Sequence, residues 1–518
     1  MSSTRSLVFL NHVAAHRLTD VLSRPIARLR SSPIGYRLAQ GVFWSFSGSL
    51  VSRGLNLLAF ILVARVLGKI GFGEFGIIQS TLGMFAVFAG FGLGLTANKH
   101  VAEYREKYPD RAGRIIALSE FVALLCGGIT ALALALLAPW LATHTLSAPH
   151  LAGALRVGAI LLFLNVLTGA QNGTLAGFEA FRAIALRSFW SGLAAFPLVV
   201  AGVYIAGLIG AVWGLLGSAA INWLLNHLAI RREARRAGIR IALDGLSEWP
   251  VLWKFSLPAT LGGIVVMPVI WICHAMLIHQ ANGYAQMGTF NAASAFPNML
   301  SFMAFTMTAP LLPLLASQQG SASTPLDRVN MLSTWFLGVM PALPLIAFPA
   351  IGEWIFGEQY RGEAFRVTLL LAVLTNCIIL YKQGLARVLA AKDLMWWGFL
   401  SNGTWAVALL ISSFYLVRWG AAGLALGFLI AYVANTVVFI PLYTWRRLVP
   451  KGTIVSVEAG IIWLSLIALA GLSFAGAPLW LRLAGLGIST LSTLCAFYRL
   501  NAPTPRLFRS EPVGCLRS

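Results

Sequence analysis

Long apolar runs separated by short polar gaps make up most of this 518-residue chain. A helix needs about 20 mainly apolar residues to cross a bilayer. Fourteen such segments can be identified: 41–66, 72–98, 115–138, 154–176, 188–206, 208–230, 254–279, 287–316, 329–351, 364–384, 394–417, 420–445, 457–475 and 477–498. Small residues such as Ala206-Gly207 and Gly420 to Gly423 split the closest pairs. The pattern predicts an all-α membrane protein with about 14 transmembrane helices.

The composition supports this prediction. Hydrophobic residues are 58% of the chain and charged residues 11%, against about 25% charged in an average soluble domain. The mean hydropathy is +0.79. These values exclude soluble globular, disordered and fibrous proteins. The five cysteines show no disulfide pattern and are expected to be free thiols.

The net charge of +21 indicates membrane topology rather than nucleic-acid binding, because the basic residues lie in the gaps between apolar runs. With the N-terminus in the cytoplasm, 30 of the 38 Lys and Arg lie in inside segments, seven lie outside and Arg53 lies within a span. Inside loops carry the excess of Lys and Arg. We therefore predict a multi-pass protein of the inner (plasma) membrane with both termini cytoplasmic.

The segments fall into five regions. These are a basic cytoplasmic N-terminal arm (1–40), an N-lobe of six helices (41–232), a C-lobe of six helices (250–446), two further helices (457–498) and a cytoplasmic tail (499–518). Gly73-Glu74-Phe75 and Gly288-Thr289-Phe290 begin corresponding helices, which favours two related lobes with a substrate site at their interface. The arm is interpreted as a lipid-contacting segment, and an organellar transit peptide is the alternative.

Arg53 is the strongest functional candidate because it lies near the middle of the first span. A charge at that depth costs at least about 2.5–3.5 kcal/mol, so it should face a wet cavity or a partner. Ser49, Ser52 and Asn56 extend a polar stripe beside it. The functional interpretation is an anion site in which the guanidinium binds a phosphate in bidentate fashion. A structural pair or a misplaced helix boundary is the alternative.

Other polar residues are weaker candidates. Lys382 and Arg387 end the tenth segment and are either topology anchors or a second phosphate contact. His274 is either a hydrogen-bonded helix residue or a cavity or proton site. Asn291 and Asn298 either bridge helices or line a polar cavity.

Several chemistries lack a signature in the sequence. Acidic residues such as Glu74, Glu120 and Glu353 are placed in loops or at helix ends, and cation coupling usually needs a buried carboxylate. No phosphate loop, HExxH or CxxC motif occurs. We therefore expect no enzyme activity, no metal and no cofactor.

Short stretches in order along the chain resemble one known family. They are GVFWSFSGSLVSRGLNLLAFILVARVLGKIGFGEFGIIQS (41–80), Leu175 to Arg182, Lys254-Phe255-Ser256-Leu257-Pro258 and Ile355 to Tyr360. These are similar to Wzx-type polysaccharide (O-antigen) flippases of the multidrug/oligosaccharidyl-lipid/polysaccharide exporter superfamily. The resemblance implies two six-helix lobes around a central cavity and two C-terminal helices.

The resemblance also implies a function, namely moving an undecaprenyl-diphosphate-linked oligosaccharide across the membrane for export of a cell-surface polysaccharide. The lipid II flippases of the superfamily use first-helix arginines in the cavity, and Arg53 is at a comparable place. Expected partners are the lipid-linked substrate, membrane lipids, and polymerase and chain-length proteins of the pathway. The alternatives are a lipid II flippase of cell-wall synthesis, a cation-coupled multidrug antiporter, and a non-transporting scaffold for a polymerase complex.

Overall fold

The protein is helical throughout the part of the chain that the computed structural model describes, and that part contains no strand. The described residues are 33–90, 92–241, 248–251, 264–308, 311, 325–392, 394–450 and 452–501. Most of the expected arm (1–32) and of the expected tail (502–518) lie outside them. Nine described helices are long and apolar enough to cross a membrane. The predicted all-α membrane fold is confirmed.

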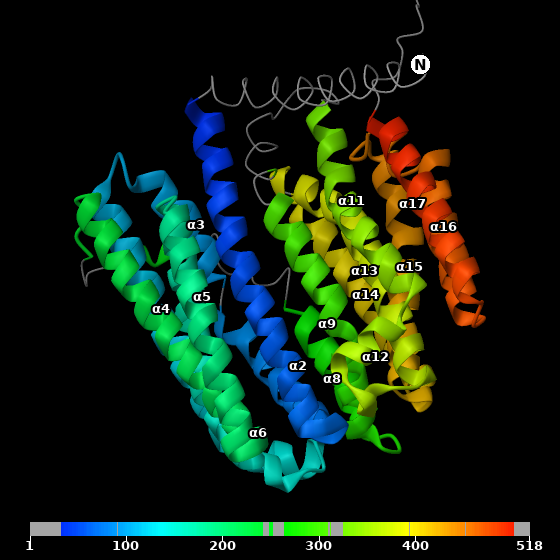
Figure 1. The fold of residues 1–518 in the computed structure, drawn as a ribbon. Helices are drawn as coiled ribbons and strands as arrows, with labels where there is room; N and C mark the ends of the chain where they lie inside the picture. Colours follow the sequence, from blue (N-terminus) through cyan, green and yellow to red (C-terminus); the bar gives the residue numbers. More distant parts are fainter. Residues whose placement is uncertain are drawn as a thin grey trace, which may run out of the picture.

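The first group of helices, which we call lobe one, lies at the left of Figure 1. It consists of α2 (Pro33–Gly90), α3 (Leu93–Tyr104), α4 (Pro109–Trp140), α5 (Ala152–Gly177) and α6 (Phe181–Arg236), with the turns η1 (Leu141–Thr145) and η2 (Pro149–Leu151). α2 and α6 are helical hairpins. They break at Gly68 (φ 69°) and Gly207 (φ 57°), and glycine adopts a positive φ without the strain that a side chain would add.

Lobe two follows with α8 (Val266–Ile278), α9 (Gly283–Thr308), α11 (Pro325–Ala347), α12 (Ala350–Phe356), η5 (Glu358–Tyr360), α13 (Glu363–Ala391), α14 (Met395–Leu416), η6 (Val417–Trp419) and α15 (Gly420–Trp445). The last two helices, α16 (Val457–Phe474) and α17 (Leu479–Asn501), pack on α11. The Trp335 ring on α11 lies 5.7 Å from Trp463 and 5.2 Å from Phe497 between ring centroids. This aromatic cluster joins the extra pair to lobe two.

The hairpins account for much of the difference between nine helices and the fourteen expected spans. The break at Ala206 and Gly207 and the turn η6 before Gly420 coincide with two splits that the sequence predicts. Among the nine helices, Arg182–Arg236 (55 residues) and Trp396–Trp445 (50 residues) each count once, although each contains two expected spans. The count of fourteen and the lobe boundaries stay predictions.

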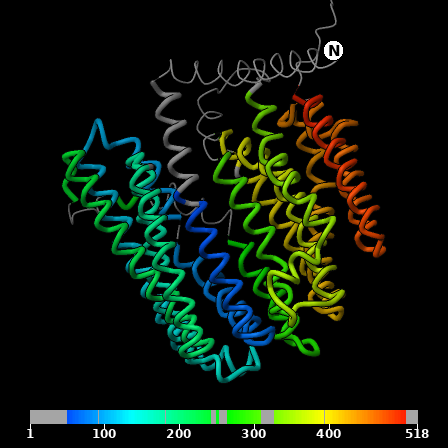
Figure 2. The backbone as a smooth tube through the Cα atoms, viewed as in Figure 1, coloured from blue at the N-terminus to red at the C-terminus, as the bar shows by residue number. Residues whose placement is uncertain are grey.

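The two lobes meet where α2 packs against α9, and Figure 2 shows the α2 backbone between the other helices of lobe one and those of lobe two. Gly73 and Gly288 bring the two backbones together. A Cβ atom on Gly73 would lie 1.9 Å from the Tyr284 carbonyl oxygen, and one on Gly288 would lie 2.0 Å from that of Lys69. The two glycines of the sequence repeat therefore pack in one seam, which only residues without a side chain permit.

Contacts between the lobes gather at the end of the bundle that contains Gly68 and Tyr360, which we call the sealed end. Arg65 donates hydrogen bonds to the carbonyl oxygens of Trp354 (3.1 Å) and Ile355 (3.0 Å) at the C-terminus of α12. The Tyr284 hydroxyl donates to the Leu146 carbonyl oxygen at 2.7 Å. A cation at a helix C-terminus is favourable because the last carbonyls carry partial negative charge. These bonds hold the lobes together at this end.

Replacing Arg65 with glutamine is expected to loosen the sealed end. The change removes a charged donor from the α12 carbonyls, which is worth about 1 kcal/mol at an exposed site. The population with separated lobes should rise about fivefold. Spin labels at positions 143 and 358, both exposed and on opposite lobes, would report this as a larger long-distance fraction in double electron–electron resonance. Arg418→Gln is the control, because Arg418 lies over Trp419 within its own lobe. An unchanged distribution would contradict the role of Arg65.

Candidate functional site

Arg53 lies on the first arm of α2 and faces lobe two. Its guanidinium carbon is 4.2 Å from the ring centroid of Phe302 on α9. A cation over an aromatic face is stabilised by the ring quadrupole, more strongly where water is scarce. The Arg53 side chain is exposed, and it forms no ion pair with any carboxylate in the described ranges. The positive charge at the lobe interface is thus accessible and not neutralised.

Two carboxamides lie on the same faces as this pair. Asn56 is three residues after Arg53, and Asn298 is four residues before Phe302, so each lies one turn away on the same side of its helix. Both side chains are exposed. Arg53, Asn56, Asn298 and Phe302 together form a surface that we call the central patch, with a cation, an aromatic face and hydrogen-bonding groups.

Ser49 and Ser52 are the other residues of the predicted polar stripe, and the central patch as defined does not include them. Ser52 packs against α6, because a Cβ atom on Gly192 would lie 2.6 Å from the Ser52 hydroxyl oxygen. The structure therefore places Ser52 in a helix contact within lobe one. The side chain of Ser49 is outside the described part of the molecule.

Asn291 and His274 lie at contacts between the lobes. The Asn291 amide nitrogen donates to the Phe72 carbonyl oxygen at 3.5 Å. The His274 Nδ1 atom shares a 2.8 Å hydrogen bond with the Ser80 hydroxyl, and His274 is buried. Both residues bridge α2 to lobe two in this conformation, rather than line open space.

Lys382 and Arg387 are held within lobe two. Lys382 donates to the Asn435 side-chain oxygen on α15. Arg387 is buried, and its guanidinium donates to Asn330 on α11 (2.7 Å to Oδ1 and 3.0 Å to the carbonyl oxygen) and to Thr308 on α9 (2.9 Å). The partners of both cations are neutral. The structure does not bring either residue into the central patch.

Replacing Arg387 with methionine is expected to destabilise the fold by about 1–3 kcal/mol. The change leaves buried neutral acceptors on Asn330 and Thr308 without their donor, and a buried polar group left unsatisfied costs about this much. The thermal unfolding midpoint of the purified protein should fall clearly, while Lys392→Met, an exposed cation at the end of the same helix, should leave it unchanged. Normal stability with lost transport would instead make Arg387 a phosphate contact, as the sequence suggested.

Arg187 is a residue of interest that sequence analysis missed. It lies on α6 and donates to Asn172 on α5 (2.7 Å) and to Asn222 (3.1 Å). Asn226 donates to the same Asn172 oxygen at 3.3 Å. The polar residues at 222 and 226 within an apolar helix were the available signal. Arg187 adds another cation with neutral partners, in lobe one.

Glu120 corrects the sequence-based placement of the acids. It lies well inside α4, which begins at Pro109. Its Oε1 atom is buried and has no hydrogen-bond partner among the described residues. A carboxylate thus lies within a long helix of lobe one, whereas the sequence analysis placed Glu120 among the acids in loops or at helix ends. By contrast, Glu353 is buried in an ion pair with Arg366, with a nitrogen–oxygen distance of 2.8 Å.

Comparison with known proteins assigns the family. The model of the family described as "Polysaccharide biosynthesis protein" matches residues 38–319, more than half of the chain. The chain belongs to this family. The matched range contains Arg53, Arg187 and Asn298 but not Lys382 or Arg387.

Curated relatives and solved structures agree with this family. The EPS I polysaccharide export inner membrane protein EpsE of Ralstonia nicotianae is 26% identical over 74% of this chain and 88% of its own length. The lipid III flippase of Escherichia coli is 24% identical over 62% of this chain and 76% of its own. The fold is similar to an inward closed conformation of the lipid II flippase MurJ (TM-score 0.65, 15% identity, 88% and 98% covered). An inward-facing MATE transporter gives a TM-score of 0.60 at 15% identity, with 77% and 94% covered. This polysaccharide biosynthesis family member is a multi-pass membrane protein whose fold is similar to that of these two solved proteins.

Proposed function

We propose that this family member is a flippase that moves an undecaprenyl-diphosphate-linked oligosaccharide from the cytoplasmic to the periplasmic leaflet of the inner membrane by alternating access. The observation that carries the proposal is Arg53, an accessible cation between the lobes that has no carboxylate partner in the described part of the chain. An exposed guanidinium can form two parallel hydrogen bonds with a phosphate group. The relatives named for polysaccharide export and lipid III flipping support this substrate class.

The central patch supplies a group for each part of the substrate. Arg53 binds the diphosphate, while Asn56 and Asn298 offer donors and acceptors to sugar hydroxyls. Phe302 provides the cation with a partner when no phosphate is bound. The lipid tail stays in the bilayer and the sugars pass between the lobes.

The sealed end corresponds to the periplasmic side in the proposed topology, with both termini in the cytoplasm. The conformation then presents Arg53 to the cytoplasm, and release requires the contacts of Arg65 and Tyr284 to break. A negative-inside potential favours outward movement of an anion by about 2.3 kcal/mol per charge per 100 mV. That energy can give the movement its direction without ATP. We propose no enzyme activity for the chain. Its proposed partners are the polymerase and chain-length proteins of the pathway.

The test is a flipping assay in proteoliposomes with a fluorescent undecaprenyl-diphosphate-oligosaccharide, with and without an imposed potential. We expect movement between leaflets that a negative-inside potential accelerates. Empty liposomes and liposomes with heat-denatured protein are the controls. No movement by the folded protein supplied with its native oligosaccharide would reject the flippase.

Two other functions are a lipid II flippase and a cation-coupled multidrug antiporter. Preference for lipid II in the same flipping assay would assign the chain to cell-wall synthesis. Glu120 is the observation that favours the second candidate, a cation-coupled multidrug antiporter, because coupling usually uses a buried carboxylate and the Oε1 atom of the half-buried Glu120 has no hydrogen-bond partner among the described residues. Proton- or sodium-dependent dye efflux that is lost in Glu120→Gln and kept in Arg53→Ala would select it.

A further inference from the structure

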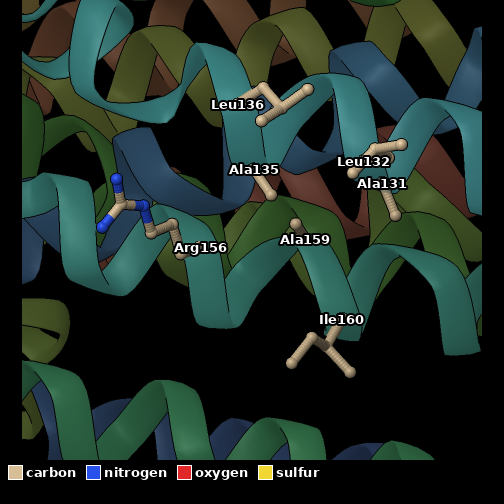
Figure 3. Close-up of a pocket in the computed structure, with 7 residues that line it drawn as sticks. All are labelled: Ala131, Leu132, Ala135, Leu136, Arg156, Ala159 and Ile160. Atoms are coloured by element: carbon tan, nitrogen blue, oxygen red, sulfur yellow. The ribbon is translucent and has the colours of Figure 1, made fainter.

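An open groove lies on the surface of lobe one, between α4 and α5. Its volume is about 570 Å³, within the range of about 300–1,000 Å³ of small-molecule sites. Figure 3 shows Ala135 and Ala159 on neighbouring helices along the groove, with Arg156 at one end and Ala131 and Leu132 at the other. The small side chains form the floor of a channel with leucine and isoleucine walls.

The groove lies where the bilayer covers the protein. Leu132, Leu136 and Ile160 on its walls are 61%, 72% and 51% exposed, as expected of side chains that contact acyl chains. Trp140, also exposed, ends α4 just beyond the groove. Exposed tryptophans mark the membrane–water interface. Leu136 is four residues before Trp140 and therefore lies about 6 Å inside this level, and Figure 3 shows Arg156 at the Leu136 end of the groove. That is the depth of lipid headgroups and the first acyl carbons.

Arg156 has no counter-charge among the residues that the structure describes. It is exposed, and no carboxylate within the described ranges forms an ion pair with it. A guanidinium at headgroup depth binds a phosphate in bidentate fashion. Its position at one end of an apolar channel matches a molecule with an anionic head and a hydrocarbon tail.

We propose that this groove is a binding site for an anionic phospholipid of the leaflet at the sealed end, with phosphatidylglycerol as its occupant. The lipid phosphate binds Arg156, and one acyl chain lies over Ala135 and Ala159 toward Ala131. The groove is separate from the central patch. Only one part of this inference rests on the proposed function, namely that the leaflet at the sealed end is the outer leaflet. A binding measurement therefore tests it independently of flipping.

The test uses the full chain in nanodiscs of phosphatidylethanolamine with 10–20 mol% phosphatidylglycerol, roughly the anionic content that attracts basic residues, and native mass spectrometry of retained lipid. Wild type should retain one phosphatidylglycerol in preference to phosphatidylethanolamine. Arg156→Gln should lower this preference about fivefold, the worth of one basic residue near the surface. Ala135→Leu, which fills the channel and keeps the charge, should lower it as well. Arg418→Gln, at the same end but outside the groove, should not.

Four results would overturn the proposal. Retention by Arg156→Gln equal to wild type would show that the arginine does not hold the lipid. Equal loss in Arg156→Gln and Arg418→Gln would show general surface charge. Undiminished retention in Ala135→Leu would leave Arg156 as an interface anchor with no bound chain. A competition experiment adds undecaprenyl phosphate, the lipid part of the proposed substrate, in an amount equal to that of phosphatidylglycerol. If it displaces phosphatidylglycerol from wild type, the groove binds undecaprenyl phosphate instead. Thermal unfolding of each variant confirms that the folded protein is compared.

Discussion

Arg53→Ala is expected to reduce flipping of the diphosphate-linked oligosaccharide by about 10- to 150-fold. The change removes a charged hydrogen-bond donor from the substrate, and such bonds are worth about 1.5–3 kcal/mol. Protein stability should change little, because Arg53 is exposed and its partner in the described structure is the Phe302 ring. The rate in proteoliposomes and the thermal unfolding midpoint measure the two effects separately.

Two control variants sharpen this test. Arg53→Lys keeps the charge but not the planar pair of donors, so it should recover part of the rate. Arg418→Ala removes an exposed arginine over Trp419 that is remote from the central patch in sequence and contacts, and should flip at the wild-type rate. Wild-type flipping by Arg53→Ala would reject the anion site.

Gly73→Ala and Gly288→Ala are expected to prevent closure of the sealed end and to reduce flipping at least about tenfold. Each added Cβ would lie within about 2 Å of a backbone carbonyl oxygen on the opposite lobe, a distance that no side-chain rearrangement relieves. Relief requires the α2 and α9 backbones to move apart, which costs the packing and hydrogen bonds of the seam. The same spin labels at 143 and 358 should report longer distances.

Gly54→Ala is the matched control for the glycine variants. It lies on the same helix, and a Cβ atom there would meet nothing within 4 Å. Alanine is favoured over glycine in a helix by about 1 kcal/mol, so the variant should be at least as stable as wild type and flip normally. If Gly73→Ala keeps wild-type distances and rates, the seam does not control closure.

Part of the site could be predicted from sequence because its cause is local. Arg53 was recognised from its depth in an apolar run, which any helix spanning a bilayer would share. The partner of such a charge is not a local property. Lys382 and Arg387 are also cations on an apolar segment, here at its end, yet their bonds to Asn435 and Asn330 place them inside lobe two. Arg187 was passed over because its partner Asn172 lies on another helix.

The sequence by itself determined the membrane class and the helical fold, because apolar length and backbone hydrogen bonding leave a spanning chain few alternatives. It indicated the family through the resemblance of short stretches such as 41–80. It also marked the repeat that begins at Gly73 and Gly288. Only the tertiary structure decided that these two glycines pack in one seam, that Phe302 faces Arg53, and that Arg156 lies at the end of a groove. Each of these relations joins residues on different helices, and side-chain periodicity along one helix fixes a face but not what that face meets.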